Sequence, residues 1–203
     1  MKLYFSPGAC SMSPHIVLQE AGLPYTTEKV DLQSRQTAGG ADFKAINPKG
    51  YVPVLEMDDG ARLTEVAAIV QYVADLAPAS GLVAPAGTLA RYQQIEWLNF
   101  IASEIHKNYS PLFNPDMSED VKNFARGNLT RRYAYVNSVL EGRDYLTGSA
   151  FTAPDSYLFT VTNWAGLVKF DLSAWPNLRA FLQRVAARPA VQQVMADEGL
   201  LAR

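Results

Sequence analysis

Residues 2–24 read KLYFSPGACSMSPHIVLQEAGLP, and this stretch decides the fold that we expect for the start of the chain. The apolar run at residues 2–5 has the composition of a strand and is closed by Ser6-Pro7-Gly8. A helical periodicity of apolar residues follows, and Gly22-Leu23-Pro24 stops it. The stretch therefore predicts a strand, a loop and a helix, with the only cysteine of the chain, Cys10, in the loop.

Strand and helix patterns continue to alternate up to about residue 78. They predict a strand at 26–32, a short helix within 41–48, a strand at 52–57, a hairpin strand after Asp58-Asp59-Gly60, and a helix at 65–77. The resulting order is βαβ, then α, then ββα. This order predicts an α/β domain over residues 1–78, with a parallel pair of strands first and an antiparallel hairpin last.

The composition changes at residues 79–87, which are rich in small residues, Pro and Gly and form the expected linker. Beyond it the chain lacks strand alternation, so we expect residues 88–203 to form an all-helical domain. Its helices are predicted at 88–109, 119–140, 154–170 and 175–188, with a short last one after Pro189. Thr152 and Asp155 have the spacing of a capping box at the start of one of these helices.

Composition and charge exclude several function classes. Eighteen basic and twenty acidic side chains give a net charge of -2, which favours neither nucleic acid nor an anionic membrane as a partner. A lone cysteine forms no internal disulfide and no Cys-x-x-Cys pair, which suits a reducing compartment. No stretch approaches the ~20 apolar residues of a membrane span or resembles a signal peptide. We therefore expect a cytoplasmic protein that binds small, roughly neutral partners.

Cys10 precedes the first predicted helix, where the helix dipole and exposed amides favour a thiolate. The alternative is a buried cysteine that acts as a small hydrophobe, which is the commoner fate of an isolated one. The surrounding Pro7, Gly8, Ser11 and Ser13 are typical of a surface loop, and they favour the reactive interpretation.

Two further motifs in the first domain could bind a ligand. Pro53 immediately precedes a strand, so the backbone of Val52 could pair with a bound peptide, although Pro53 could equally mark only a strand start. Glu65 falls at the start of a helix, where free amides bind anions, and its alternative role is helix capping beside Thr64.

In the helix predicted at 88–109, Asn99, Ser103 and His106 follow one another at i, i+4 and i+7 beside the apolar face. This polar row fits a cleft, and a solvated helix edge explains it equally well. The sequence contains no metal-ligand spacing, no phosphate-binding loop of the P-loop type and no G-x-S-x-G nucleophile elbow. We therefore expect no metal.

The whole chain resembles the cytosolic glutathione S-transferases, and within them the bacterial beta class. Five motifs carry the resemblance: SPGACSMSPHIVLQE at 6–20, NPKGYVPVLE at 47–56, LTEVAAIVQYVAD at 63–75, the helix that contains Asn99 to His106, and FTAPDSYLF at 151–159. Each motif alone is weak, and their combination is specific. The resemblance implies a thioredoxin-like N-terminal domain and an all-helical C-terminal domain.

The resemblance also implies a set of residues that bind glutathione. Val52 would pair with its cysteinyl part beside a cis Pro53, Glu65 and the amide of Val66 would hold the γ-glutamyl end, and Arg35 would meet the glycine carboxylate. Cys10 would face the glutathione sulfur. The helical domain would supply Asn99, Ser103, Glu104 and His106, with His106 near the sulfur and some contacts reaching across a homodimer.

The activity implied by the resemblance is conjugation of the glutathione thiolate to hydrophobic electrophiles, with no cofactor beyond glutathione as co-substrate. Cys10 adds a second activity, glutathione-dependent thiol-disulfide exchange. Cys10 and His106 are the implied catalytic residues, and Tyr4 and Ser11 are hydroxyl candidates if Cys10 proves dispensable. A different class of function is a non-catalytic protein that keeps this fold to bind a macromolecule or to regulate.

Overall fold

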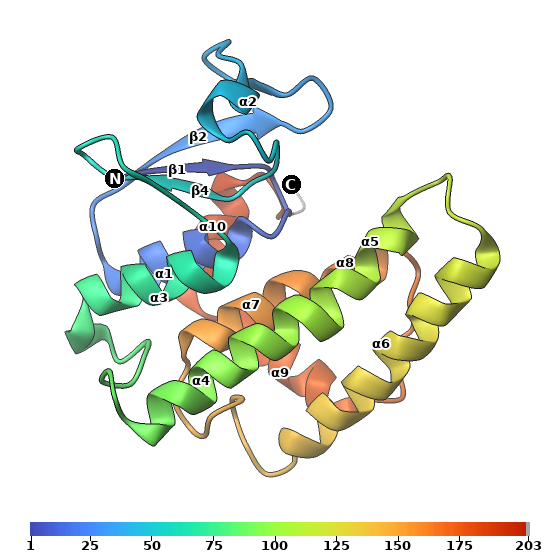
Figure 1. Cartoon of the computed structure of the whole chain (residues 1–203). Coiled ribbons are helices and arrows are strands. Elements are labelled where there is room, and N and C mark those ends of the chain that lie inside the picture. The colour runs from blue at the N-terminus through green and yellow to red at the C-terminus, as the bar shows by residue number, and fades with distance from the viewer. Residues whose placement is uncertain (202–203) are drawn as a thin grey trace. The chain divides into compact units, whose positions relative to one another are not determined.

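The computed structural model describes residues 1–201, which divide into two compact units. The N-terminal unit comprises Met1–Val83 together with residues 188–201, and the helical unit comprises Ala84–Ala187. Figure 1 shows strands only in the first of these and helices throughout the second.

The N-terminal unit contains a mixed sheet that is five-stranded within the described residues, in the order β3-β2-β1-β4-β5. Strand β1 is parallel to β2 and antiparallel to β4, and β4 forms an antiparallel hairpin with β5. The prediction of an α/β, thioredoxin-like domain is confirmed. The strands are β1 Lys2–Phe5, β2 Thr26–Asp31, β3 Gln36–Thr37, β4 Val54–Glu56 and β5 Arg62–Thr64; the helical elements are α1 Met12–Ala21, α2 Phe43–Ile46, α3 Val66–Leu76, the 3-10 turn η1 Pro78–Ser80 and α10 Pro189–Asp197.

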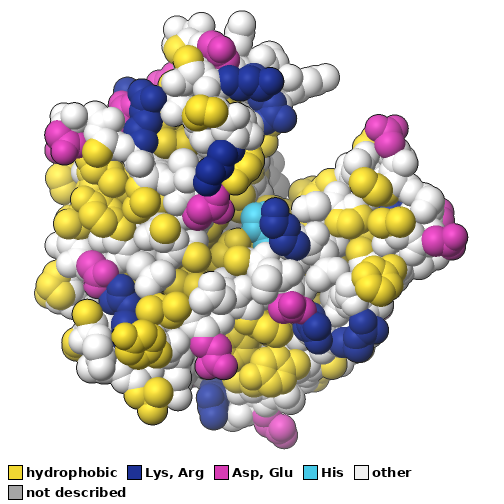
Figure 2. Space-filling view, in the orientation of Figure 1, with side chains coloured by type: hydrophobic (Ala, Val, Ile, Leu, Met, Phe, Trp, Pro, Cys, Tyr) yellow, Lys and Arg dark blue, Asp and Glu magenta, His cyan; other side chains and the backbone are white. Residues whose placement is uncertain are grey.

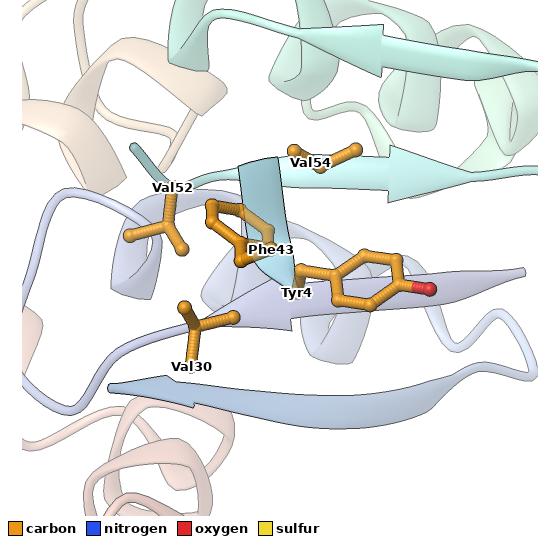
Figure 3. Close-up of a cluster of buried hydrophobic side chains, with 5 residues drawn as sticks. All are labelled: Tyr4, Val30, Phe43, Val52 and Val54. Carbon is orange, nitrogen blue, oxygen red and sulfur yellow. The ribbon is translucent and has the colours of Figure 1, made fainter. Parts of the chain in front are cut away.

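The two faces of the sheet are covered by different helices. Helices α1 and α3 pack together on one side, and α2 lies on the other (Figure 1). Figure 3 shows Phe43 of α2 lying over a buried cluster that comprises Tyr4, Val30, Val52 and Val54. Because side chains alternate along a strand, the neighbours of Tyr4 in β1 face the opposite layer.

Strand β3 is an element that the sequence pattern does not predict. It contains two residues and pairs with the end of β2 in an antiparallel arrangement. Arg35 precedes it with a φ of 61°, a left-handed conformation that turns the chain back toward β2. Two residues are too few to show an alternation of apolar and polar side chains.

The C-terminal segment groups with the N-terminal unit, whereas the sequence places residues 88–203 together in a helical domain. Helix α10 packs against α1, and Arg188 forms a two-pronged ion pair with Glu20 at 2.6 and 2.9 Å. Glu198 adds a buried contact, with Oε1 2.9 Å from Nδ1 of His15. These contacts span long sequence separations, which local composition does not reveal.

The helical unit is organised around α7, in which every residue from Ala153 to Thr162 is buried. Helices α4 and α9 pack against α7, and α6 packs against α5 and α9. The all-helical prediction for this region is confirmed. Its elements are α4 Leu89–Phe100, the π-helical turn η2 Ile101–His106, α5 Lys107–Phe113, α6 Glu119–Val139, α7 Ala153–Thr162, α8 Trp164–Leu167 and α9 Pro176–Ala186.

The π-helical turn η2 interrupts what the sequence predicts as a single α-helix over 88–109. The elements α4, η2 and α5 follow one another without a gap from Leu89 to Phe113, so the helical segment starts where it is predicted and continues past the predicted end at residue 109. Hydrogen bonds of the i→i+5 type turn the chain through fewer degrees per residue than an α-helix does. The i, i+4, i+7 alignment expected for Asn99, Ser103 and His106 assumes α-helical geometry throughout, and the π turn removes that premise.

The start of α7 is held by a buried carboxylate. Asp155, which is fully buried, accepts hydrogen bonds at 2.8 Å from the N–H and from the hydroxyl of Thr152. Its other oxygen accepts from the N–H of Leu146 at 2.9 Å. The capping box that the sequence predicts at Thr152 and Asp155 is therefore present, and it also fixes the preceding loop.

Charges of both signs are interspersed over the face of the molecule that Figure 2 displays. This distribution agrees with the nearly equal numbers of basic and acidic residues. Among residues 1–201, none of the helices combines the length and the apolar character that crossing a membrane requires.

Replacing Asp155 by Ala should lower the free energy of unfolding of the helical unit by about 2–4 kcal/mol, because three donors lose a buried charged acceptor. The three tryptophans, Trp97, Trp164 and Trp175, all lie in this unit, so fluorescence during urea unfolding reports on it. The matched control is Asp171→Ala, which removes an exposed carboxylate whose hydrogen bonds go to Ser173, two residues away. Equal losses in the two variants would contradict the role of Asp155.

Candidate functional site

The topology of the sheet brings four candidate segments to the same end of the N-terminal unit. In the register, Tyr4 lies opposite Val54, and Val54 lies opposite Thr64. The loop after β1, the segment before β4 and the residue after β5 therefore meet at this end. Strand β2 runs parallel to β1, so the loop after β2 starts there as well. These segments carry Cys10, Val52-Pro53, Glu65 and Arg35.

The loop that carries Cys10 is held closed by hydrogen bonds at both sides of the cysteine. The buried hydroxyl of Ser11 accepts from the N–H of Ser6 at 3.1 Å and lies 3.2 Å from the Ser6 carbonyl, to which it donates. The N–H of Gly8 donates to Oε2 of Glu198 at 2.8 Å. The loop thus has a defined shape, in which α1 begins two residues after Cys10.

Cys10 is partly exposed, and its Sγ lies 3.3 Å from the carbonyl oxygen of Val52, to which the thiol donates. The bond between Val52 and Pro53 is cis, as the family resemblance implies. The surface-loop interpretation of Cys10 agrees with this placement, and the alternative of a fully buried cysteine does not. The structure therefore brings two of the candidate residues into direct contact.

The hydroxyl groups of Tyr4 and Ser11 are engaged elsewhere. Tyr4 donates to the carboxylate of Glu56 at 3.4 Å, and Figure 3 shows its hydroxyl pointing away from Val52. Ser11 uses its hydroxyl to close the loop, as described above. Neither hydroxyl is therefore positioned to replace the thiol of Cys10 in activating a ligand.

Glu65 lies at the N-terminus of α3 in an unusual backbone conformation, with φ 73° and ψ 123°. Its Oε1 accepts from Nζ of Lys49 at 2.6 Å and from the hydroxyl of Tyr51 at 2.9 Å. Positive φ is strained for a residue with a Cβ, so the surrounding contacts must stabilise this conformation. Val66 is the first residue of α3, and its buried side chain leaves the backbone as its only means of contacting a ligand.

Lys49 and Tyr51 are contacts of the site that sequence reasoning missed. The hydrogen bond to Glu65 raises the pKa of Lys49, so the ammonium group of Lys49 stays charged at neutral pH. Burial, followed by the hydrogen bond to Glu65, raises the pKa of Tyr51 and keeps its phenol protonated. The sequence feature that could have indicated them is the motif NPKGYVP, in which Lys49 and Tyr51 alternate with Gly50 and Val52.

Arg35 reaches the same loop from the turn between β2 and β3. Its guanidinium donates to the carbonyl of Gly50, two residues before Val52. A guanidinium carries five N–H donors in a planar fork, so this contact uses only part of its capacity for an anion. Arg35 and Lys49 therefore place two cationic groups at this end of the sheet.

In the helical unit, the candidate residues are engaged mainly with their own or adjacent helices. Asn99 donates to the carbonyl of Ile95 at 3.0 Å, and Ser103 donates to that of Asn99 at 2.9 Å. Both side chains are exposed and folded back onto the preceding turn. Glu104 forms an ion pair with Arg132 of α6 at 2.6 Å.

His106 ends the π turn and contacts α7 and α8. Its Nδ1 lies 2.7 Å from the hydroxyl of Tyr157, and the ring of Trp164 packs against it with a centroid distance of 4.9 Å. His106 is partly buried, whereas Asn99 and Ser103 are exposed. The side chain of His106 therefore lies in a different environment from those of Asn99 and Ser103, although the sequence pattern places all three in one row.

Other features do not identify a site by themselves. A depression of about 550 Å³ in the N-terminal unit includes none of the candidate residues in its lining, which comprises Phe5, His15, Gln19, Leu23, Pro24, Tyr25, Thr26, Thr27 and Asp197. In the described part of the chain, no group of three or more His, Cys, Asp or Glu side chains is arranged to hold a metal ion.

Comparisons with known protein families match most of the chain. Residues 8–76 match the glutathione S-transferase N-terminal domain, and residues 100–189 match the glutathione S-transferase C-terminal domain. Among curated proteins, glutathione S-transferase GstA of Escherichia coli O157:H7 is 47% identical over 98% of this chain and 100% of its own length.

Solved structures resemble the chain over nearly its full length. A ternary complex of BphK, a bacterial GST, has a TM-score of 0.97 at 52% identity and covers 98% of this chain and 100% of its own. A sphingomonad glutathione S-transferase complexed with glutathione has a TM-score of 0.95 at 44% identity, over 99% and 100% of the two chains. A beta class enzyme of Sphingomonas chungbukensis has the same TM-score and coverage at 42% identity, which agrees with the expected class.

Proposed function

The chain belongs to the glutathione S-transferase family, and from this premise we propose how its residues bind glutathione and direct its thiol. It is a transferase that takes glutathione as its co-substrate. The contact between the thiol of Cys10 and the carbonyl of Val52 is the observation that carries the proposal. This contact places the nucleophilic sulfur of Cys10 beside the backbone of Val52, with which a bound peptide can form hydrogen bonds.

The γ-glutamyl end of glutathione binds at the start of α3. This end carries both a carboxylate and an ammonium group. The N–H of Val66 and the positive end of the helix dipole receive the carboxylate, and Glu65 receives the ammonium. The ammonium takes the position that Nζ of Lys49 occupies at Oε1 of Glu65.

The cysteinyl part of glutathione pairs with the backbone of Val52, next to Pro53. A carbonyl oxygen has two lone pairs, so Val52 can accept from the ligand N–H while it keeps the contact with Cys10. This pairing directs the glutathione sulfur toward Cys10. Arg35, beside Gly50, then meets the glycine carboxylate, because a planar guanidinium suits a carboxylate.

Conjugation follows from a positioned thiolate. The thiol of glutathione loses its proton to solvent, its sulfur forms a bond to an electrophilic carbon of a hydrophobic acceptor, and the leaving group departs with the bonding electrons. The helical unit contributes His106 to this step, and Asn99, Ser103 and Glu104 contribute to ligand binding. In this step the S–H of Cys10 turns from the carbonyl of Val52 to the glutathione thiolate and stabilises it by a hydrogen bond.

Cys10 also supports thiol-disulfide exchange. Its thiolate attacks the glutathionyl sulfur of a mixed disulfide, which forms a Cys10–glutathione disulfide and releases the other partner as a thiol. A second glutathione then attacks the glutathionyl sulfur, releasing glutathione disulfide and restoring Cys10. This activity uses the same bound tripeptide and needs no further reductant.

The protein is further proposed to act as a homodimer in the cytoplasm. Homodimers are what the family resemblance implies, and some of the ligand contacts of the helical unit are expected to reach the partner. The lone cysteine supports a reducing compartment, because it cannot form an internal disulfide.

Replacing Glu65 by Gln should weaken glutathione binding by about tenfold to a hundredfold, because a hydrogen bond to a charged partner contributes about 1.5–3 kcal/mol. Isothermal titration calorimetry of the full chain measures the change in Kd. The matched control is Glu56→Gln on β4, which removes a carboxylate paired with Arg62 and outside the proposed site. An unchanged Kd in Glu65→Gln would remove Glu65 from the site. If the wild-type protein is folded and does not bind glutathione, the whole binding mode is refuted.

Replacing Cys10 by Ala should separate the two activities. We expect reduction of a glutathionylated substrate to fall by more than about a hundredfold, because the attacking sulfur is lost. Conjugation of a chloronitrobenzene should fall by about tenfold or less, since only one hydrogen bond to the thiolate is removed. Reduction that proceeds at the wild-type rate would show that no Cys10–glutathione disulfide forms on the pathway.

A further inference from the structure

The contact between His106 and Tyr157 joins the end of the π turn to the centre of the helical unit. Nδ1 of His106 and the hydroxyl of Tyr157 are 2.7 Å apart, and their rings meet edge to face. Tyr157 is 3% exposed and lies in α7, whose residues are all buried. Trp164 packs against the imidazole from α8. The ring of His106 is therefore held in a fixed orientation by a rigid neighbour.

The chemistry of the two groups favours one direction for this hydrogen bond. A phenol O–H is a more acidic donor than the N–H of a neutral imidazole, and the unprotonated ring nitrogen is a more basic acceptor than a phenol oxygen. The bond is therefore stronger when the hydroxyl of Tyr157 donates to Nδ1. An imidazole that accepts at Nδ1 carries its hydrogen on Nε2.

We propose that Tyr157 is a positioning residue that holds His106 in the tautomer with hydrogen on Nε2. The inference rests on the proposed role of His106 in conjugation. With Nδ1 engaged by Tyr157, His106 meets the reacting groups through Nε2–H. It acts there as a hydrogen-bond donor that stabilises the negative charge of a thiolate, and it does not act as the base that removes the thiol proton.

His15, the other histidine of the chain, provides a contrast within the same molecule. Its Nδ1 lies 2.9 Å from Oε1 of Glu198, and the second oxygen of that carboxylate accepts from Gly8. A carboxylate accepts, so Nδ1 of His15 donates, and the neutral ring of His15 then carries its hydrogen on Nδ1, the opposite of the tautomer inferred for His106. A spectrum of the two histidines should therefore contain two different patterns.

The tautomers are measured by long-range proton–nitrogen NMR of the full chain labelled at histidine, at a pH where both rings are neutral. We expect His106 to show an unprotonated Nδ1 that accepts a hydrogen bond. In Tyr157→Phe, that nitrogen resonance should move toward the value of an unbonded ring nitrogen, while the His15 signals stay in place. A protonated Nδ1 in the wild type, or no shift in Tyr157→Phe, would overturn the proposal whatever the kinetics show.

Kinetics test whether the tautomer matters for the reaction. We expect Tyr157→Phe to lower kcat for conjugation by about threefold to tenfold, the effect of one lost hydrogen bond, with the KM for glutathione unchanged. The matched control is Tyr133→Phe, which removes another buried hydroxyl of the unit that bonds to Tyr109 and Thr162. Equal loss of kcat in both variants would overturn the positioning role.

A double-mutant cycle separates this inference from the proposed function. If Tyr157 acts through His106, Tyr157→Phe should have no further effect on kcat in a His106→Ala background. An additional loss in that background would overturn the positioning role. If His106→Ala alone leaves kcat unchanged, the proposed role of the histidine fails and the positioning role with it, although the NMR assignment of the tautomer would stand.

Discussion

The antiparallel register between β1 and β4 is the constraint on which the rest of the site depends. It sets Tyr4 opposite Val54, so the loop that leaves β1 and the segment that enters β4 must meet at one end of the sheet. The thiol of Cys10 and the carbonyl of Val52 are in contact for this reason. The hairpin partner β5 ends at the same level, which brings Glu65 and the first turn of α3 to that end.

The C-terminal segment stabilises this arrangement from outside the sheet. Glu198 accepts from the backbone of Gly8 and lies against His15, so a residue near the end of the chain fixes the loop that precedes Cys10. Arg188 and Glu20 hold the start of the same segment to α1. In the helical unit, Asp155 and Tyr157 lie on one buried helix, and they fix the preceding loop and the imidazole of His106 respectively.

Local patterns in the sequence predict much of the fold and part of the site. Pro and Gly around Cys10 mark its loop, Asp58-Asp59-Gly60 marks the hairpin, and Thr152 with Asp155 marks the start of α7. These features depend on neighbours a few residues apart, which a sequence shows directly. Glu65 at a helix start is predictable in the same way.

The remaining features depend on contacts between distant residues. Nothing local distinguishes Arg188 as a partner of Glu20, or indicates that the turn at Ile101–His106 is π-helical and rotates His106 toward Tyr157. The pairing of Lys49 and Tyr51 with Glu65 depends on the hairpin that brings β5 beside the loop. Their side chains were visible in the motif, but their common partner was not.

A crystal structure of the chain with bound glutathione tests the central claim most directly. The account predicts that the cysteinyl backbone pairs with Val52, that the γ-glutamyl carboxylate accepts from the N–H of Val66, and that the ligand sulfur lies against Cys10. Glutathione bound without any contact to Val52, or with its sulfur directed away from Cys10, would contradict it.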